Sequence, residues 1–253
     1  MKVHLTAIGG TGMGALAGLL VEAGDEVRGS DGPLYPPMST LLEELEIPVY
    51  NGYAATHLDW GPDLVVLGNS CRSDHLEYLA AQERGLRVAS FPELLSERFL
   101  ADRHSIVIAG THGKTTTTSL TAHILRIAGL DPGYLIGGVP LDTQKSFALG
   151  KPPYFVIEGD EYDCAFFDKR PKFVHYFPKY LILNNIEFDH ADIYPDLASI
   201  KDVFRKLMRI VPRSGLVVAN GDDPAVREVI APIYSRLQVF SRESGDSSYR
   251  ILE

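Results

Sequence analysis

A glycine-rich segment at residues 109–118 constrains the fold of this chain more than any other feature. It reads AGTHGKTTTT and directly follows the apolar run at residues 105–108. A short buried strand, a glycine-rich turn, a lysine and then hydroxyl side chains at the start of a helix form an arrangement that binds the phosphates of a nucleoside triphosphate. The pattern therefore predicts an α/β unit with a nucleotide site at the end of one strand.

Each residue type in this loop has a physical role. Gly110 and Gly113 allow backbone N–H groups to curl around phosphate oxygens without a Cβ in the way. The helix that follows adds a partial positive charge. We expect Lys114 to reach the β- and γ-phosphates of the nucleotide and Thr115 to bind Mg²⁺. The loop departs from the usual motif, because Ile108 stands where its first glycine is expected.

A second glycine-rich turn lies at the N-terminus. The apolar run at residues 3–8 is followed by Gly10, Thr11, Gly12 and Met13, and Asp31 lies at the end of the next predicted strand. This pattern fits a Rossmann-like diphosphate site in which an acidic residue binds a ribose. It is compatible with any nucleotide that carries a diphosphate, including a nicotinamide cofactor of an oxidoreductase. Two such loops in one chain indicate two phosphate-bearing ligands.

Predicted strands and helices alternate along the whole chain. Strands are expected at residues 26–29, 64–67, 87–90, 106–109, 155–158, 180–183 and 216–219. Helices are expected at 74–84, 197–210 and 225–230, and after the phosphate loop, where Leu120, Ile124, Ile127 and Ala128 share a face. Alternation of this kind predicts parallel sheets covered by helices. We expect a Rossmann-like domain over residues 1–100, an ATP-binding α/β domain over 101–253, a join at 94–103 and a loop at 137–150.

Composition excludes several classes of protein. The net charge is −9, from 24 basic and 33 acidic residues, and no basic run of the kind that binds nucleic acid is present. Two cysteines, Cys71 and Cys164, are too few for a disulfide framework or a zinc site. Neither a signal peptide nor an apolar run of membrane-spanning length is apparent. We therefore expect a cytoplasmic protein with no membrane or nucleic acid partner; the oligomeric state is not predicted.

Acidic and histidine side chains follow two of the strands in the second half. Glu158 ends one strand, where it would meet Mg²⁺ from the side opposite Thr115. His190 follows another strand and is a candidate ligand for a second divalent ion. Solvated surface loops are the alternative interpretation of both segments. Asp222 and Asp223 are most simply a helix N-cap ahead of Pro224.

The combined pattern resembles the Mur ligases, ATP-dependent amide-forming enzymes of peptidoglycan synthesis. Three segments are similar to theirs: the phosphate loop from Gly110 to Thr117, the glycine run at residues 8–14 and the motif NIEFDH at 185–190. A narrower resemblance, to the recycling branch of the family, rests on residues 161–173, with 35–40 and 136–140. The branch that adds L-alanine usually has a different segment after the pair Asp160-Glu161.

The resemblance implies a reaction and a set of site residues. ATP would phosphorylate the lactyl carboxylate of UDP-N-acetylmuramate, and the amine of L-alanyl-γ-D-glutamyl-meso-diaminopimelate would attack the acyl phosphate. Lys114, Glu158 and His190 would be catalytic, with Thr115, Glu158 and His190 as Mg²⁺ ligands. The ATP-binding set is Gly110, Thr111, His112, Gly113, Lys114, Thr115 and Thr116, and the UDP-substrate set is Gly10, Thr11, Gly12, Met13, Ser30 and Asp31.

The resemblance also implies a further domain for the amine substrate, so we expect this chain to be a fragment. Two alternatives stay open. One is the L-alanine ligase of de novo synthesis, and the other is a nucleotide-binding fragment without activity of its own. Some family members carry a carbamylated lysine after the NIEFDH-type motif, but the spacing does not assign that role to Lys206.

Overall fold

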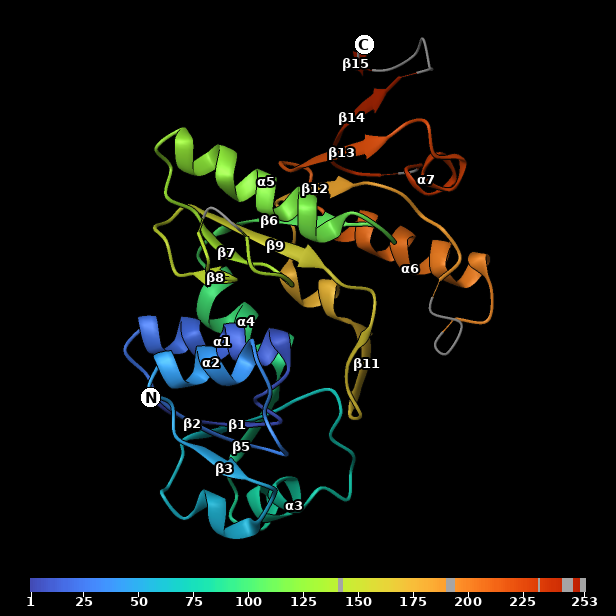
Figure 1. Ribbon diagram of the computed structural model, residues 1–253. Coiled ribbons are helices and arrows are strands. Elements are labelled where there is room, and N and C mark those ends of the chain that lie inside the picture. Colours follow the sequence, from blue (N-terminus) through green and yellow to red (C-terminus); the bar gives the residue numbers. More distant parts are fainter. Residues whose placement is uncertain (141–142, 190–193, 232, 243–247, 251–253) are drawn as a thin grey trace. The chain divides into compact units, whose positions relative to one another are not determined.

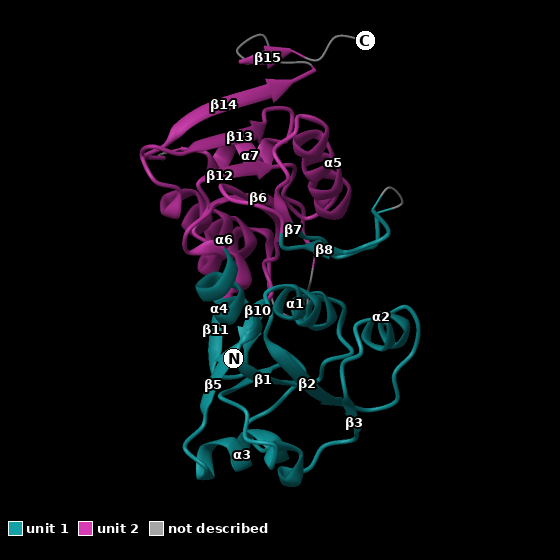
Figure 2. Ribbon diagram, turned by 90° about the vertical axis from the view of Figure 1, so that its left-hand side faces the viewer, with its two compact units in different colours: residues 1–99, 134–149, 163–170 teal, residues 100–133, 150–162, 171–253 magenta. Residues whose placement is uncertain are grey.

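The computed structural model describes residues 1–140, 143–189, 194–231, 233–242 and 248–250 (Figure 1). The chain forms two compact units (Figure 2). Unit 1 contains residues 1–99, 134–149 and 163–170, and unit 2 contains residues 100–133, 150–162 and 171–253. Each unit has a parallel sheet with helices on both faces, so the predicted α/β fold class is confirmed.

Unit 1 is built on a five-stranded sheet of order β3-β2-β1-β4-β5. Its strands are β1 (Lys2–Thr6), β2 (Glu26–Asp31), β3 (Val49–Asn51), β4 (Leu64–Leu67) and β5 (Arg87–Ser90), and all neighbouring pairs are parallel. Helices α1 (Thr11–Glu22), α2 (Met38–Glu44) and α4 (Phe91–Leu95) lie on one face, with the π-helical turn η2 (Ser96–Leu100) after α4. The other face carries α3 (Leu76–Glu83) and η1 (Ala55–Leu58).

Two segments from the second half of the sequence, residues 134–149 and 163–170, belong to unit 1. One contains β8 (Phe147–Ala148), which pairs antiparallel with β7 (Gly133–Leu135), and it lies inside the segment expected to be a loop. Phe147 is fully buried on α1, where a Cβ at Gly18 would lie only 2.0 Å from its ring. The other segment forms the hairpin of β10 (Asp163–Ala165) and β11 (Asp168–Pro171). Phe166 of this hairpin packs edge-on against Tyr78 of α3, with ring centroids 4.9 Å apart.

Unit 2 contains a run of parallel strands in the order β15-β14-β13-β12-β6-β9. The strands are β6 (His104–Ala109), β9 (Tyr154–Gly159), β12 (Tyr180–Leu183), β13 (Leu216–Asn220), β14 (Arg236–Ser241) and β15 (Tyr249–Arg250). Helix α5 (Lys114–Ile127) covers one face, and α6 (Leu197–Ile210) with α7 (Pro224–Val229) covers the other (Figures 1 and 2). A short 3₁₀ helix, η3 (Lys172–Tyr176), contacts α6.

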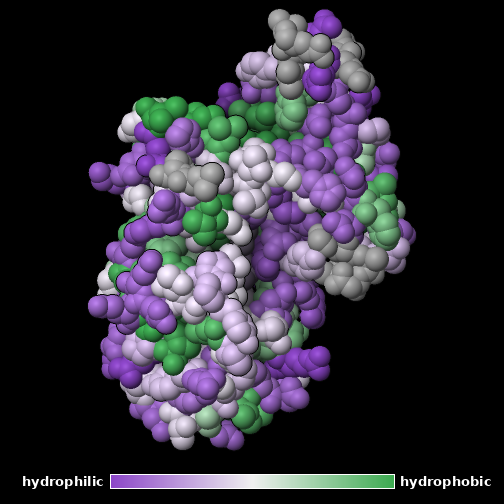
Figure 3. Space-filling view, viewed as in Figure 1, coloured by the Kyte–Doolittle hydropathy of each residue, from purple (hydrophilic) through white to green (hydrophobic). Residues whose placement is uncertain are grey.

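The apolar face of α5 is the exposed face of that helix. Leu120, Ile124 and Ile127 are 55%, 50% and 74% exposed, whereas the buried positions are Thr118 and Ala122. Hydrophobic surface accordingly lies over this helix in Figure 3. The predicted periodicity is present, but the small side chains are the ones turned inward, because α5 lies close to β6 and β9.

The carboxyl ends of β6, β9 and β12 meet at one edge of the sheet, because these strands are parallel and adjacent. The loops that leave this edge carry the phosphate loop, Glu158 and the segment after Leu183. Both cysteines are buried, and neither forms a disulfide. Among the described residues, no helix is both long and apolar enough to cross a membrane.

Candidate nucleotide-binding sites

The phosphate loop joins β6 to α5. Gly110 has φ 138°, and a Cβ there would lie 3.0 Å from the backbone O and 3.1 Å from the backbone N of Asn185. Gly113, with φ 78°, is the N-cap of α5. Both positions need a left-handed backbone conformation that side chains disfavour, so the loop can turn back only with glycine at these places.

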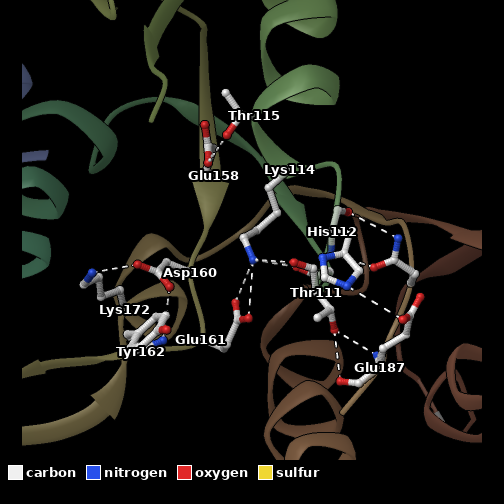
Figure 4. Close-up of polar contacts among 12 residues, drawn as sticks. Thr111, His112, Lys114, Thr115, Glu158, Asp160, Glu161, Tyr162, Lys172 and Glu187 are labelled. Atoms are coloured by element: carbon white, nitrogen blue, oxygen red, sulfur yellow. Dashed lines mark hydrogen bonds and ion pairs between the residues drawn. The ribbon is translucent and has the colours of Figure 1, made fainter. Parts of the chain in front are cut away.

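The segment after β12 supports the loop from outside. Thr111 donates its backbone N–H to the carbonyl of Asn185 at 3.1 Å, and the N–H of His112 donates to Asn185 Oδ1 at 2.8 Å. Thr111 Oγ1 accepts from the N–H of Glu187 at 2.9 Å and donates to its carbonyl at 3.2 Å (Figure 4). The segment predicted to bind a second metal therefore also holds the phosphate loop in shape.

Lys114 begins α5 and folds back across the loop. Its Nζ donates to the carbonyls of Gly110 at 2.7 Å and Thr111 at 3.3 Å, and lies 3.1 and 3.3 Å from the two carboxylate oxygens of Glu161 (Figure 4). The Glu161 side chain is only 3% exposed, and Tyr194 donates its hydroxyl to the Glu161 carbonyl at 2.7 Å. The lysine is thus held at the loop by a buried carboxylate.

Thr115 and Glu158, our two candidate ligands for a first Mg²⁺, lie at hydrogen-bonding distance from each other. Thr115 Oγ1 donates to Glu158 Oε2 at 3.0 Å, and both residues stand where the carboxyl end of β9 meets the start of α5 (Figure 4). A hydroxyl and a carboxylate oxygen at hydrogen-bonding distance are ligands of the kind that Mg²⁺ prefers. Thr116 is exposed on the first turn of α5, and His190 lies outside the described residues.

The sequence analysis missed the supporting contacts of two residues. The first is Glu161, which is one of four carboxylates in six residues and could not be distinguished from its neighbours. The second is Asp223, whose predicted role as a helix N-cap is confirmed by its 3.0 Å bond from Val226 N–H. Its other oxygen accepts from Ile186 N–H at 3.0 Å, which anchors the segment that supports the phosphate loop.

The glycine turn of unit 1 joins β1 to α1. Gly10 is the N-cap of α1, and Thr11, Gly12 and Met13 form its first turn. Asp31, at the end of β2, accepts from Gly9 N–H at 2.7 Å, Gly32 N–H at 2.7 Å and the Tyr53 hydroxyl at 2.9 Å. The predicted ribose-binding carboxylate therefore also fixes the shape of the turn.

Ser30 is placed differently from the other predicted residues of this site. It is fully buried, and its hydroxyl donates to Glu77 at 2.6 Å on the face of the sheet covered by α3. The backbone carbonyl of Ser30 instead reaches the turn, because it accepts from the N–H groups of Ala7 at 2.8 Å and Ile8 at 3.2 Å. Beside Asp31, a cavity of about 330 Å³ opens at the ends of β2 and β3, lined by Gly32, Pro33, Leu34, Val49, Tyr50 and Asn51.

Two family descriptions match almost the whole chain. The Mur ligase middle domain matches residues 108–252, and the Mur ligase family catalytic domain matches residues 2–103. The chain belongs to the Mur ligase family. The resemblance inferred from the two glycine loops is therefore confirmed.

Among Mur ligases, the chain is similar to those named for a tripeptide substrate. It is 48% identical over 231 residues to the UDP-N-acetylmuramate–L-alanyl-γ-D-glutamyl-meso-2,6-diaminoheptandioate ligase of Escherichia coli, covering 91% of this chain and 50% of that protein. The UDP-N-acetylmuramate–L-alanine ligase of Clostridium perfringens is 34% identical over 252 residues, covering 100% of this chain and 53% of that protein. The chain thus spans about half the length of these relatives.

Solved structures give the same picture. The structure of a ligase of the tripeptide type from Neisseria meningitides has a TM-score of 0.90 and 46% identity, covering 95% of this chain and 78% of that chain. A murein peptide ligase from Psychrobacter arcticus has a TM-score of 0.87 and 42% identity, covering 96% of this chain and 55% of that chain. The parallel-sheet architecture of both units is that of these ligases.

Proposed function

We propose that this chain is the nucleotide-binding part of an ATP-dependent ligase. Its reaction would join UDP-N-acetylmuramate to L-alanyl-γ-D-glutamyl-meso-diaminopimelate in peptidoglycan recycling. The observation that carries the proposal is the position of Lys114, held at a glycine loop beside the Thr115–Glu158 pair. The 48% identity to a ligase named for this tripeptide supports the choice of substrate.

The chemistry proposed is activation of a carboxylate. The lactyl carboxylate attacks the γ-phosphorus of ATP and ADP departs, which leaves an acyl phosphate. The amine of the peptide then attacks the acyl carbon, inorganic phosphate leaves, and the amine loses a proton as the amide forms. Phosphoryl transfer depends mainly on positioning and on neutralising charge, and Lys114 would supply one positive charge at the β- and γ-phosphates.

Mg²⁺ fits the residues at the end of β9. Thr115 and Glu158 would hold it, and it would neutralise charge on the phosphate oxygens when bound. His190, outside the described residues, remains our candidate for a second ion. The UDP diphosphate would lie over Gly10 to Met13 at the N-terminus of α1, with the nucleoside toward the cavity beside Asp31.

The test uses Lys114→Ala and measures both ligands. Calorimetry of the 253-residue chain should show that wild type binds both ATP and UDP-N-acetylmuramate. Ligation is measured separately, in a longer natural protein that contains this chain. Removal of one oxyanion-hole donor lowers rates by about 10²–10³-fold. By comparison with that loss, we expect Lys114→Ala to lose most ligation and retain the affinity for UDP-N-acetylmuramate. Equal weakening of both ligands would contradict the two-site assignment.

Substrate choice is tested separately with the same protein. Phosphate release should require both UDP-N-acetylmuramate and the tripeptide. Equal turnover with free L-alanine would move the assignment to the L-alanine ligases, to which the chain is also similar. If the longer protein binds both nucleotides but forms no amide, the result favours a nucleotide-binding module. Binding of NADH would instead favour an oxidoreductase.

A further inference from the structure

A buried polar cluster lies beneath the proposed UDP site, on the opposite face of the unit 1 sheet from α1. Its centre is Glu77 of α3, which is fully buried. One carboxylate oxygen, Oε2, accepts from Thr6 Oγ1 at 2.7 Å and Ser30 Oγ at 2.6 Å, and lies 3.1 Å from His4 Nε2. These three partners are also fully buried.

Burying these polar groups costs free energy that an apolar contact between α3 and the sheet would not. Burying a carboxylate disfavours its charged form by several kcal/mol unless it is fully hydrogen-bonded. The face of β1 beneath α1 is apolar, with Val3 and Leu5, whereas His4 and Thr6 alternate with them and face Glu77. The position of the partners suggests what this polar face does.

The first arm of the cluster reaches the glycine turn. Thr6 and Ser30 are paired across β1 and β2, and each is within one residue of its strand's carboxyl end. The carbonyl of Ser30 accepts hydrogen bonds from the N–H groups of Ala7 and Ile8. The carboxylate of the next residue, Asp31, accepts from the N–H groups of Gly9 and Gly32. One carboxylate oxygen therefore fixes the two strand ends from which the diphosphate turn and its acidic residue emerge.

The second arm reaches the cavity. The other oxygen, Oε1, lies 2.9 Å from His57 Nδ1 of η1. The His57 ring stacks on Tyr50 with centroids 4.4 Å apart and planes 9° apart. Tyr50 lines the cavity beside Asp31. The two oxygens of Glu77 thus support the two parts of the proposed UDP site.

We propose that Glu77 is a positioning residue for the UDP nucleotide: it fixes the glycine turn through Thr6 and Ser30 and the cavity wall through His57 and Tyr50. This inference rests on the proposed function of unit 1. Residues that orient metal ligands from behind typically lower metal affinity by about 10- to 100-fold when removed, and we expect an effect of the same order for a residue that positions a nucleotide site. The effect should be confined to the UDP ligand, because none of these residues belongs to unit 2.

The test compares Glu77→Met with Glu77→Gln by calorimetry. Glutamine keeps a carbonyl oxygen for Thr6 and Ser30 and places an amide group toward His57, which can accept as the other tautomer. We expect Glu77→Met to lower the affinity for UDP-N-acetylmuramate at least about tenfold. Glu77→Gln should restore most of that affinity, and the affinity for ATP should be unchanged in both variants. Gln82→Ala, which removes another polar contact of α3, is the matched control and should change neither ligand.

Ser30→Ala covers the case in which Glu77→Met fails to fold. In ¹⁵N-glycine-labelled protein, we expect this smaller change to shift the amide signals of Gly9 and Gly32 and to weaken the UDP ligand. Unchanged affinity in folded Glu77→Met, or equal loss of ATP and UDP ligand, would overturn the positioning role. Wild-type protein that binds no UDP-N-acetylmuramate would instead overturn the proposed function, while the glycine signals would still report whether Ser30 positions the turn.

Discussion

Glu77, beneath the proposed UDP site, is constrained by burial, and Gly110, in the phosphate loop, is constrained by its backbone conformation. The effect of each constraint on stability can be measured by substitution. Glu77 is the clearest case of a buried charge. Burial alone raises the pKa of its carboxyl, but the hydrogen bonds from His4, Ser30 and Thr6 outweigh burial and lower the pKa to about 2, from 4.5. A carboxyl with a lowered pKa stabilises the fold above its unfolded pKa, and this contribution is lost as the pH falls through the folded pKa.

We therefore expect acid destabilisation of unit 1 between pH 4.5 and pH 2. The full contribution of Glu77 is on the order of 3 kcal/mol, since one pKa unit corresponds to about 1.4 kcal/mol. The groups that face this carboxylate are His4 on β1 and His57 on η1, with Thr6 and Ser30. Denaturant unfolding followed by the single tryptophan, Trp60 in unit 1, measures the effect. The difference in stability between wild type and Glu77→Gln should shrink as the pH falls from 4.5 to 2; a constant difference down to pH 2 would contradict the assignment.

Gly110 is the clearest case of a constrained backbone. An alanine there would adopt an unfavourable φ and also press its Cβ against the backbone of Asn185. Gly129, with φ 78° and open space around it, isolates the first effect. We expect Gly129→Ala to cost about 1 kcal/mol and Gly110→Ala about 2–3 kcal/mol. Chemical denaturation of both variants checks the difference, and equal losses would mean that the contact with Asn185 is relieved without cost.

At the scale of elements, most strands and helices could be predicted and the supports between them could not. The helix over residues 197–210 is α6 with the same bounds, because its apolar side chains repeat at helical spacing and Asp196 caps it. The phosphate loop was predictable because its chemistry is local in sequence. The bonds that Asn185 accepts from His112 and Asp223 accepts from Ile186 join residues 73 and 37 positions apart, and no local periodicity reports such contacts.

The two helix caps Asp196 and Asp223 allow this difference to be measured. Asp196 caps α6 through Ser199 N–H at 2.8 Å, and Asp223 caps α7 but also accepts from Ile186 N–H. Losing a cap costs about 1 kcal/mol, and leaving a second donor unpaired adds about 1–3 kcal/mol. We expect Asp223→Ala to be the more destabilising variant in chemical denaturation. It should also lower the affinity for ATP, whereas Asp196→Ala should leave that affinity unchanged. Equal effects would show that the Ile186 bond contributes nothing.

At the scale of the whole molecule, the compact units are not simple halves of the sequence. Residues 134–149 and 163–170 belong to unit 1, although the surrounding chain belongs to unit 2. Phe147 and Phe166 explain this arrangement, because each is packed against a unit 1 helix. Aromatic side chains bury 150–250 Å² each, yet nothing in their local sequence indicates which helix they contact. Our expected boundary at residue 100 remains a proposal for the domains.

The final prediction concerns how two ligands act on two units. A ligand that binds only the folded state stabilises it by about 2.7 kcal/mol at 100 times its Kd. The proposed sites lie in different units, so each ligand should slow hydrogen exchange in its own unit first. We expect UDP-N-acetylmuramate to protect amides at residues 9–14 and a non-hydrolysable ATP analogue with Mg²⁺ to protect those at residues 110–118. Lys114→Ala should remove only the second effect, because its ammonium bonds to the carbonyls of Gly110 and Thr111. Protection of both turns by one ligand alone would mean that the units respond together, and the assignment of one nucleotide to each turn would then need direct structural evidence.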